Sequence, residues 1–307
     1  MKTVGLAAVV LLNLVPVMAQ ERAVDLEDVM QSAEEWAGEN LDEDSLCALQ
    51  SADQEKVRRL FARVQKEFQG EYVVDVAALK DAVKAVLPLL ESSEDTLPYA
   101  LWFKTRLDYL EVADQFRLTV PPPAVEPGQP PKPVPNPAPQ KEREIWNKQL
   151  AERPWPPNAK PYVQELKPIF AAQKVPPELV WMAEVESSFD PRVRSPAGAA
   201  GLFQLMPATA RRYGLKTSWP FDQRLKPEPS ARAAAQHLRL LHSQFKDWRL
   251  ALAAYNAGEG TVQNLLTRHK ATTYDAIATR LPAETQLYVP KIEATLLRRE
   301  GVKLSEL

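Results

Sequence analysis

One proline-rich stretch limits how this chain can fold. Residues 121–139, PPPAVEPGQPPKPVPNPAP, contain ten of the 28 prolines in the 307-residue chain. Proline lacks a backbone N–H and fixes φ, so such a run forms an extended polyproline segment rather than a helix or a central strand. We therefore expect a semi-rigid linker over residues 119–140, with one structural unit on each side. A recognition motif for a proline-binding module is the weaker alternative.

Helical periodicity dominates both sides of this linker. Apolar residues recur three and four positions apart in DEDSLCALQSADQEKVRRLFARVQKEF and in PYALWFKTRLDYLEVADQF, and strand-like alternation is scarce. The sequence predicts a mainly α protein, with a separate helical region over residues 20–118 and a second domain over residues 141–307. The side chains expected in the N-terminal core are Trp36, Leu60, Phe61, Val64, Phe68, Trp102 and Leu110.

Prolines, polar caps and glycines predict helix boundaries in the second domain. One helix should begin at Pro176-Pro177 and end at Asp190-Pro191, because the residue before proline avoids the helical region. The further boundaries expected are an N-cap at Ser230, a helix end at Asn256 before two glycines, and a last helix from near Pro282 to about Arg299.

The N-terminus, MKTVGLAAVVLLNLVPVMAQER, has the pattern of a secretory signal peptide. Lys2 precedes an apolar run that is too short to span a membrane, and small residues end at Ala19. We expect cleavage after residue 19, no membrane segment in the mature chain, and a periplasmic address in a Gram-negative host. Cys47 is the single cysteine, so no intramolecular disulfide can form.

Charge is distributed unevenly along the chain. Residues 141–307 hold 25 Lys and Arg against 17 Asp and Glu, a net charge of +8, and the remainder carries −10. The basic half could favour an anionic polymer, or the two halves could neutralise each other across a contact. Nucleic acid is not an expected partner. The three histidines, His237, His242 and His269, lack metal-ligand spacing, so neither a metal nor a cofactor is expected.

The segment WMAEVESSFDP, residues 181–191, holds two glutamates one residue apart. On a helical wheel, Glu186 falls on the apolar side and Glu184 among more polar neighbours. An isolated carboxyl in apolar surroundings has a raised pKa, which suits a general acid near neutral pH. The alternative is a structural ion pair with Arg192 or Arg194. Glu184 is expected to be a solvated or cap-region residue.

A run of small residues follows, RSPAGAAGLFQLMPATA over residues 194–210. The small side chains near Gly201 would let the backbone approach a ligand closely. The Gln204 amide could bind sugar hydroxyls or an acetamido group, and Phe203 and Met206 could contact a sugar face. Each of these residues could instead serve packing alone. Together with Glu186 they predict a substrate cleft.

Three motifs in order, EVESSFDPRVRSPAGAAGLFQLMPATA, AAYNAGEG and ETQLYVPKI, resemble the SLT domain of lytic transglycosylases. These are lysozyme-like enzymes that cleave bacterial peptidoglycan, and the resemblance covers about residues 160–300. It implies a lysozyme-like α-helical catalytic domain in which Glu186 is the catalytic acid and base. The substrate-binding residues that it implies are Ser187, Ser195, Gly201, Gln204, Met206, Tyr255, Asn256 and Tyr288.

The resemblance also implies the reaction and the partner. The substrate would be peptidoglycan glycan strands, cleaved at the MurNAc-GlcNAc bond without water to give a 1,6-anhydro product. A hydrolytic muramidase or chitinase-like enzyme is the alternative, and it would need a second carboxylate, with Asp190 considered first. A catalytically silent peptidoglycan-binding scaffold is the other alternative. Residues 20–118 show no catalytic constellation, and a docking role toward a cell-envelope protein is expected for them by elimination.

Overall fold

The computed structural model describes residues 52–307 with the exception of 92–93, 95, 121–132 and 219. Within this part the chain forms α-helices and short 3₁₀ helices, with isolated β-bridges but no strand. The prediction of a mainly α protein is therefore confirmed. The expected signal peptide, Trp36 and most of the proline-rich run lie outside the described residues.

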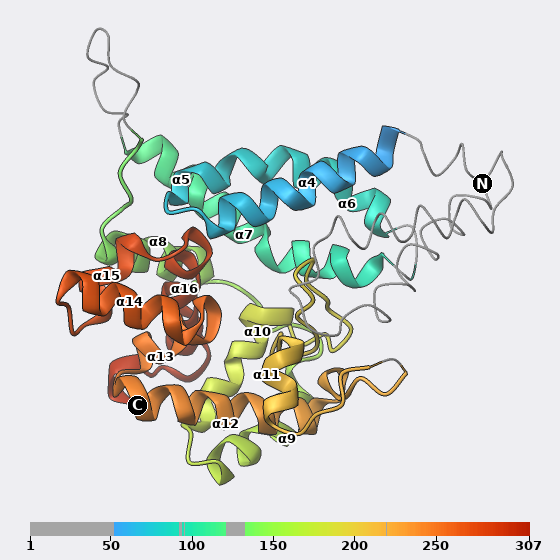
Figure 1. Ribbon diagram of the computed structural model, residues 1–307, viewed down its shortest axis with the longest axis vertical. Coiled ribbons are helices and arrows are strands. Elements are labelled where there is room, and N and C mark those ends of the chain that lie inside the picture. Colours follow the sequence, from blue (N-terminus) through green and yellow to red (C-terminus); the bar gives the residue numbers. More distant parts are fainter. Residues whose placement is uncertain (1–51, 92–93, 95, 121–132, 219) are drawn as a thin grey trace, which may run out of the picture.

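Helices occupy both halves of the chain (Figure 1). Those of the N-terminal half are α4 (Ala52–Gln69), α5 (Val73–Val76), η1 (Ala77–Leu79), α6 (Lys80–Glu91) and α7 (Leu97–Thr119). Those of the C-terminal half are α8 (Pro139–Leu150), α9 (Ala159–Ala172), η2 (Pro177–Trp181), α10 (Met182–Ser187), α11 (Pro207–Arg212), η3 (Gln223–Leu225), α12 (Pro227–Phe245), α13 (Trp248–Ala257), α14 (Glu259–His269), α15 (Tyr274–Ile277), η4 (Ala278–Arg280), α16 (Ala283–Glu300) and η5 (Leu304–Glu306).

One hydrophobic core lies among α4 to α7. Val64, Phe68, Trp102 and Leu110 are buried there as the periodicity predicted, and Phe61 packs against them while partly exposed. The side chain of Leu60 lies outside the described part. Bringing these apolar faces together removes them from water, which is the main force that holds such short helices in place.

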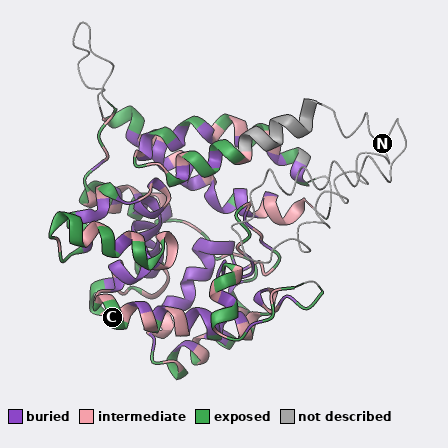
Figure 2. Ribbon diagram, in the orientation of Figure 1, coloured by how far each residue is buried: buried purple, intermediate pink, exposed green. Residues whose placement is uncertain are grey.

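This N-terminal core continues into the C-terminal half. Trp146, Val193, Ala283, Leu287 and Ala294 belong to the same buried cluster as the side chains of α4 to α7. Figure 1 shows α7 passing above α10, with α8 and α16 beside it. Helix α16 is covered along most of its length because it packs against both halves (Figure 2).

Hydrogen bonds reinforce this contact between the halves. The Asn136 amide, at the end of the proline-rich segment, accepts from Val73 N at 2.9 Å and donates to the backbone carbonyl oxygens of Glu71 and Thr279. Gln286 Nε2 also donates to Glu71 O, at 2.7 Å. The described end of the linker is thus anchored to helices on both sides.

A second core lies wholly within the C-terminal half. Helices α9, α12, α13 and α16 bury a continuous apolar cluster around α10. Asp247 caps α13 by accepting a hydrogen bond from Leu250 N at 2.9 Å. This core presents α10 and the loop after it to the underside of α7.

Two predicted helix boundaries are wrong. The helix that begins near Pro177 ends at Ser187 rather than at Asp190, because Ser188 and Phe189 adopt left-handed backbone conformations. Helix α12 begins at Pro227 rather than after Ser230, since proline suits the first helical turn. The helix end near Asn256 and the span of the last helix are confirmed within one or two residues.

Candidate active site

The last turn of α10 carries Glu186, and hydrogen bonds from the following backbone stabilise this turn. Ser188 and Phe189 have φ values of 51° and 58°. Their N–H groups return to Glu184 O at 3.0 Å and to Ala183 O at 3.1 Å, which satisfies carbonyl oxygens at the helix end. A bulky aromatic residue is rarely left-handed, so surrounding packing must hold Phe189 there. The position of Glu186 is accordingly determined by its backbone.

Glu186 is only 3% exposed, and its carboxyl has two polar contacts among the described residues. Tyr288, on α16, donates its hydroxyl to Glu186 Oε1 at 2.7 Å. Arg106, on α7, approaches Oε2 with Nη2 at the longer distance of 3.4 Å and donates from Nη1 to the Glu186 backbone carbonyl at 2.9 Å. One carboxyl oxygen is therefore firmly bonded and the other only weakly.

Burial decides the protonation of this carboxyl. Desolvation raises the pKa of Glu186 from 4.5 to about 7, although the charge of Arg106 and the hydrogen bond from Tyr288 both lower it. The charge of Glu284 adds to the rise. A carboxyl with a pKa near 7 can both donate and accept a proton at neutral pH, as the wheel position predicted.

Glu184, the other glutamate on this turn, is a structural residue. It is 4% exposed, and its two oxygens accept from Arg299 at 2.8 and 2.7 Å in a bidentate pair. The prediction of a solvated residue is wrong because α16 covers this side of α10 as well. The Arg299 guanidinium supplies the charge that burial of Glu184 requires.

The structural alternative for Glu186 named the wrong arginines. Arg192 pairs with Asp190, and Arg194 lies 3.4 Å from Asp222. The arginine that contacts Glu186 is Arg106, which comes from the N-terminal half. The sequence did contain a signal for the burial of Arg106, because this residue stands four positions after Trp102 and four before Leu110, on the face expected to be buried. That spacing does not identify its partner.

Glu284 is a second residue of the site that sequence reasoning missed. Its Oε1 accepts from Arg106 Nη2 at 3.2 Å, so the same nitrogen faces both Glu284 and Glu186. Glu284 lies in the first turn of α16, one turn before Tyr288. Glu284 lies near Glu186 because of the way α16 packs, and the local sequence does not indicate that packing.

The loop after α10 is organised around its own backbone. Ser195 Oγ accepts from Ala199 N at 2.9 Å and closes a tight turn. Gly201 has a φ of +83°, and a Cβ there would lie 1.9 Å from Arg224 O. The close approach that the small residues allow is therefore made to the backbone of η3 in this structure.

Gln204, Ser187 and Met206 differ in what they can offer a ligand. Gln204 Nε2 donates to Val193 O and Gly201 O, while Oε1 is buried with no hydrogen-bond partner among the described residues. Ser187 Oγ donates to Ala183 O and Leu202 O. Met206 is 43% exposed, whereas its neighbour Phe203 is fully buried in the core. Of these side chains, Met206 is the one available for surface contact.

The AAYNAGEG motif reaches the same region from α13. The Tyr255 hydroxyl donates to Phe203 O at 2.7 Å, and burial together with the charge of Glu186 raises its pKa well above 10. Asn256 Oδ1 accepts from the Thr285 hydroxyl at 2.6 Å. Tyr255 and Tyr288 therefore border Glu186 as neutral phenols. The roles in substrate binding expected for the eight residues named above stay predictions.

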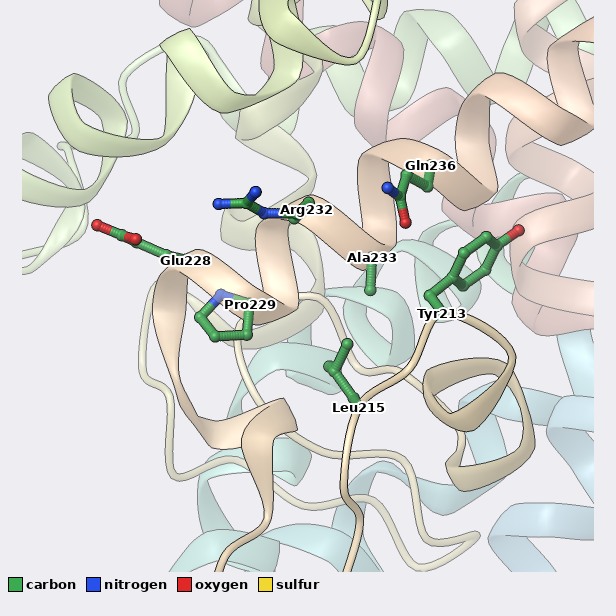
Figure 3. A pocket seen from close by; sticks show the side chains of 7 residues that line it. All are labelled: Tyr213, Leu215, Glu228, Pro229, Arg232, Ala233 and Gln236. Carbon is green, nitrogen blue, oxygen red and sulfur yellow. The ribbon is translucent and has the colours of Figure 1, made fainter.

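A surface pocket of about 240 Å³ lies beside α12 rather than at Glu186 (Figure 3). Tyr213, Arg232 and Gln236 are among its lining residues. The Tyr213 hydroxyl contacts His237 Nδ1 at 3.2 Å, and the His237 ring stacks obliquely near Tyr255. Burial lowers the pKa of His237 to about 4, so it is a neutral packing residue.

Fold and site together define a class of protein. A helical domain presents a buried carboxyl with a pKa near 7, flanked by neutral tyrosines, and such an arrangement is chemically capable of general acid–base work. The family model described as "Transglycosylase SLT domain" matches residues 169–277. Residues 169–277 therefore match a transglycosylase SLT domain, as the motifs predicted.

Proteins similar in sequence to this chain include lytic murein transglycosylases. The chain is 40% identical over 154 residues to membrane-bound lytic murein transglycosylase D of Escherichia coli K12, covering 48% of this chain and 34% of that protein. It is 38% identical over 121 residues to the soluble lytic murein transglycosylase of Salmonella typhimurium, covering 37% and 19%. The chain thus spans about a third or less of the length of these relatives.

Among solved structures, the chain is similar to the 70-kDa soluble lytic transglycosylase in complex with bulgecin A. The TM-score is 0.42 at 17% identity, over 98% of this chain and 67% of that one. An inactive mutant of the lytic transglycosylase Slt from Pseudomonas aeruginosa matches with a TM-score of 0.41 at 18% identity, over 96% and 67%.

Proposed function

We propose that this protein is an exported lytic transglycosylase that cleaves the MurNAc-GlcNAc bond of peptidoglycan and forms 1,6-anhydro-MurNAc ends. The observation that carries the proposal is the buried Glu186 carboxyl, with a pKa of about 7, in the glutamate–serine pair of an SLT domain. The names of the relatives, which describe cleavage of murein, support the choice of substrate.

In the first step Glu186 acts as a general acid. Tyr288 donates to Oε1, so the transferable proton of the neutral acid resides on Oε2, where the contact with Arg106 is long. Transfer of this proton to the glycosidic oxygen breaks the bond at C1 of MurNAc. The hydrogen bond from Tyr288 then stabilises the carboxylate that remains.

In the second step the same carboxylate acts as a base. It removes the proton of the MurNAc C6 hydroxyl, whose oxygen attacks C1 of the same sugar and closes the anhydro ring. Attack within one sugar benefits from proximity and needs no enzymic nucleophile. Two other carboxylates, Asp190 and Glu284, are each paired with an arginine: Asp190 with Arg192, and Glu284 with Arg106.

The remaining expectations complete this proposal. Met206, Tyr255 and Asn256 border the region where a glycan strand would lie, and Ser195 and Gln204 hold the loop beneath it. Residues 1–19 direct export to the periplasm. In the described part of the chain, no helix combines the length and apolar character needed to cross a membrane.

Mass spectrometry of muropeptides released from purified sacculi tests the proposal. The mature protein should release fragments whose MurNAc end is one water lighter than a reducing end, and Glu186→Gln should release none. General acid–base groups contribute on the order of 10²–10⁴-fold to rates, so the loss should be near complete. Reducing ends would establish hydrolysis instead, and binding without release by either protein would support the scaffold alternative.

A further inference from the structure

The acid of this site is held by a residue from outside the SLT domain. Arg106 lies on α7, far before residue 169, where the family match begins. It is 3% exposed, and both of its terminal nitrogens face the last turn of α10. The guanidinium also lies over the ring of Trp102, 5.0 Å from its centroid, which fixes its plane.

We propose that Arg106 is a positioning residue for Glu186, and that Glu284 balances its charge so that Glu186 can keep its proton. This proposal rests on the function proposed above. Arg106 holds the backbone through Glu186 O at 2.9 Å and approaches the carboxyl at 3.4 Å, so it fixes where the acid stands while binding it only loosely.

Charge counting explains why two carboxylates accompany one guanidinium. If Glu186 and Glu284 were both ionised beside Arg106, the buried cluster would carry a net negative charge, which is costly away from water. Glu284 is the nearer of the two to Arg106 Nη2, at 3.2 Å, and the more exposed. Glu284 is therefore the closer partner of Arg106, and its charge raises the pKa of Glu186.

The groups that face Glu186 come from three helices in the described structure. Helix α7 contributes Arg106 and Tyr109, α13 contributes Tyr255, and α16 contributes Glu284 and Tyr288. The three phenols have a pKa raised well above 10 by burial, so they are neutral wherever Glu186 titrates. Arg106 and Glu284 are thus the charges that oppose each other at the acid.

This arrangement predicts opposite effects for two neutralising substitutions. Arg106→Gln removes the charge that favours the carboxylate, so the pKa of Glu186 should rise. Glu284→Gln removes the charge that disfavours it and leaves Glu186 as the remaining anionic contact of Arg106 among the described residues, so the pKa should fall. Damage to packing alone cannot move the same pKa in both directions.

The test is the pH dependence of muropeptide release by the full-length protein and its variants. The alkaline limb of kcat/KM reports the pKa of the free acid, and it should move up in Arg106→Gln and down in Glu284→Gln. A shift of one unit corresponds to about a tenfold change in rate on that limb. The matched control is Arg153→Gln. Arg153 pairs with Asp108, which lies on α7 as Arg106 does, but Arg153 does not contact Glu186. This variant should leave the alkaline limb in place.

A second measurement separates this proposal from the proposed function. The ¹³C carboxyl resonance of Glu186, identified by its absence in Glu186→Gln, reports the pKa without any turnover. Opposite shifts in the two variants support the inference even if the protein releases no muropeptides, and an unmoved resonance and limb overturn it even if the protein is active. Should Arg106→Gln not fold, the downward shift in Glu284→Gln is still required.

Discussion

The two faces of α10 bury similar glutamates for opposite purposes. On one face, Glu184 meets Arg299 in a bidentate pair, and the whole arrangement lies within the C-terminal half. On the other face, Glu186 meets one tyrosine at short range and one arginine at long range, and the arginine comes from the N-terminal half. The two glutamates are thus similarly buried but differ in the geometry of their partners. Around Glu186, where the arginine is distant, burial raises the pKa of the carboxyl to about 7.

The two faces of α10 also differ in which half of the chain completes them. The face with Glu184 needs only the helices that follow the linker, whereas the face with Glu186 is completed by α7. Lys291 repeats this pattern, since α16 carries it and its ammonium donates to Asp108 and to Thr105 O on α7. The N-terminal helices thus contribute directly to the surroundings of Glu186.

Removal of α4 to α7 is the most disruptive way to test this difference. A chain that begins at residue 133 leaves Trp146 and Leu287 uncovered and Lys291 without Asp108. We expect this truncated chain to lose cooperative thermal unfolding, because the smaller buried core no longer offsets the conformational entropy lost on folding. Circular dichroism and calorimetry measure the transition. A truncated chain that unfolds cooperatively and releases muropeptides with an unchanged pH profile would show that the Glu186 face is self-sufficient.

Glu184→Gln should be the most destabilising single substitution on α10. It leaves the Arg299 guanidinium buried without its anion, and breaking a buried pair in this way costs about 3–5 kcal/mol. Urea unfolding measures the loss. Below the unfolding transition the variant should retain the pH profile of the parent protein, and a shifted profile would mean that the two faces are electrostatically coupled.

Glu186→Gln should have the opposite effect on stability, and the effect should depend on pH. The folded pKa of Glu186 is raised from 4.5 to about 7, so its contribution is fully present below pH 4.5 and is lost as the pH rises through 7. The variant should match the parent near pH 4 and become more stable by up to about 3 kcal/mol above pH 7. Paired urea titrations at several pH values check this, and a constant difference would contradict it.

Tyr288→Phe should give the smallest of these effects. It removes the short hydrogen bond that favours the Glu186 carboxylate, so the pKa of Glu186 should rise. A hydrogen bond to a charged group contributes about 1.5 kcal/mol, which corresponds to an upward shift of about one pH unit in the alkaline limb of activity. The control is Tyr274→Phe, which should leave the limb unmoved because the buried Tyr274 hydroxyl has no hydrogen-bond partner in the described part of the chain.

Local sequence signals predicted the helical class, the SLT domain and the burial of Glu186. Helical periodicity, a proline-rich boundary and three ordered motifs predicted a mainly α chain with an SLT domain, and the wheel placed Glu186 on the apolar side. These features depend on residues close in the chain, where spacing alone determines which side chains share a helix face.

Tertiary structure alone decided what surrounds that acid. Arg106 is 80 residues before Glu186, and Tyr288 is 102 residues after it. Glu184 is buried against Arg299, which lies 115 residues later in the chain, so its position on the helical wheel wrongly predicted a solvated side chain. Charge and burial act through space, so the pKa of a buried carboxyl depends on how distant helices pack against it, and no local pattern in the sequence encodes that packing.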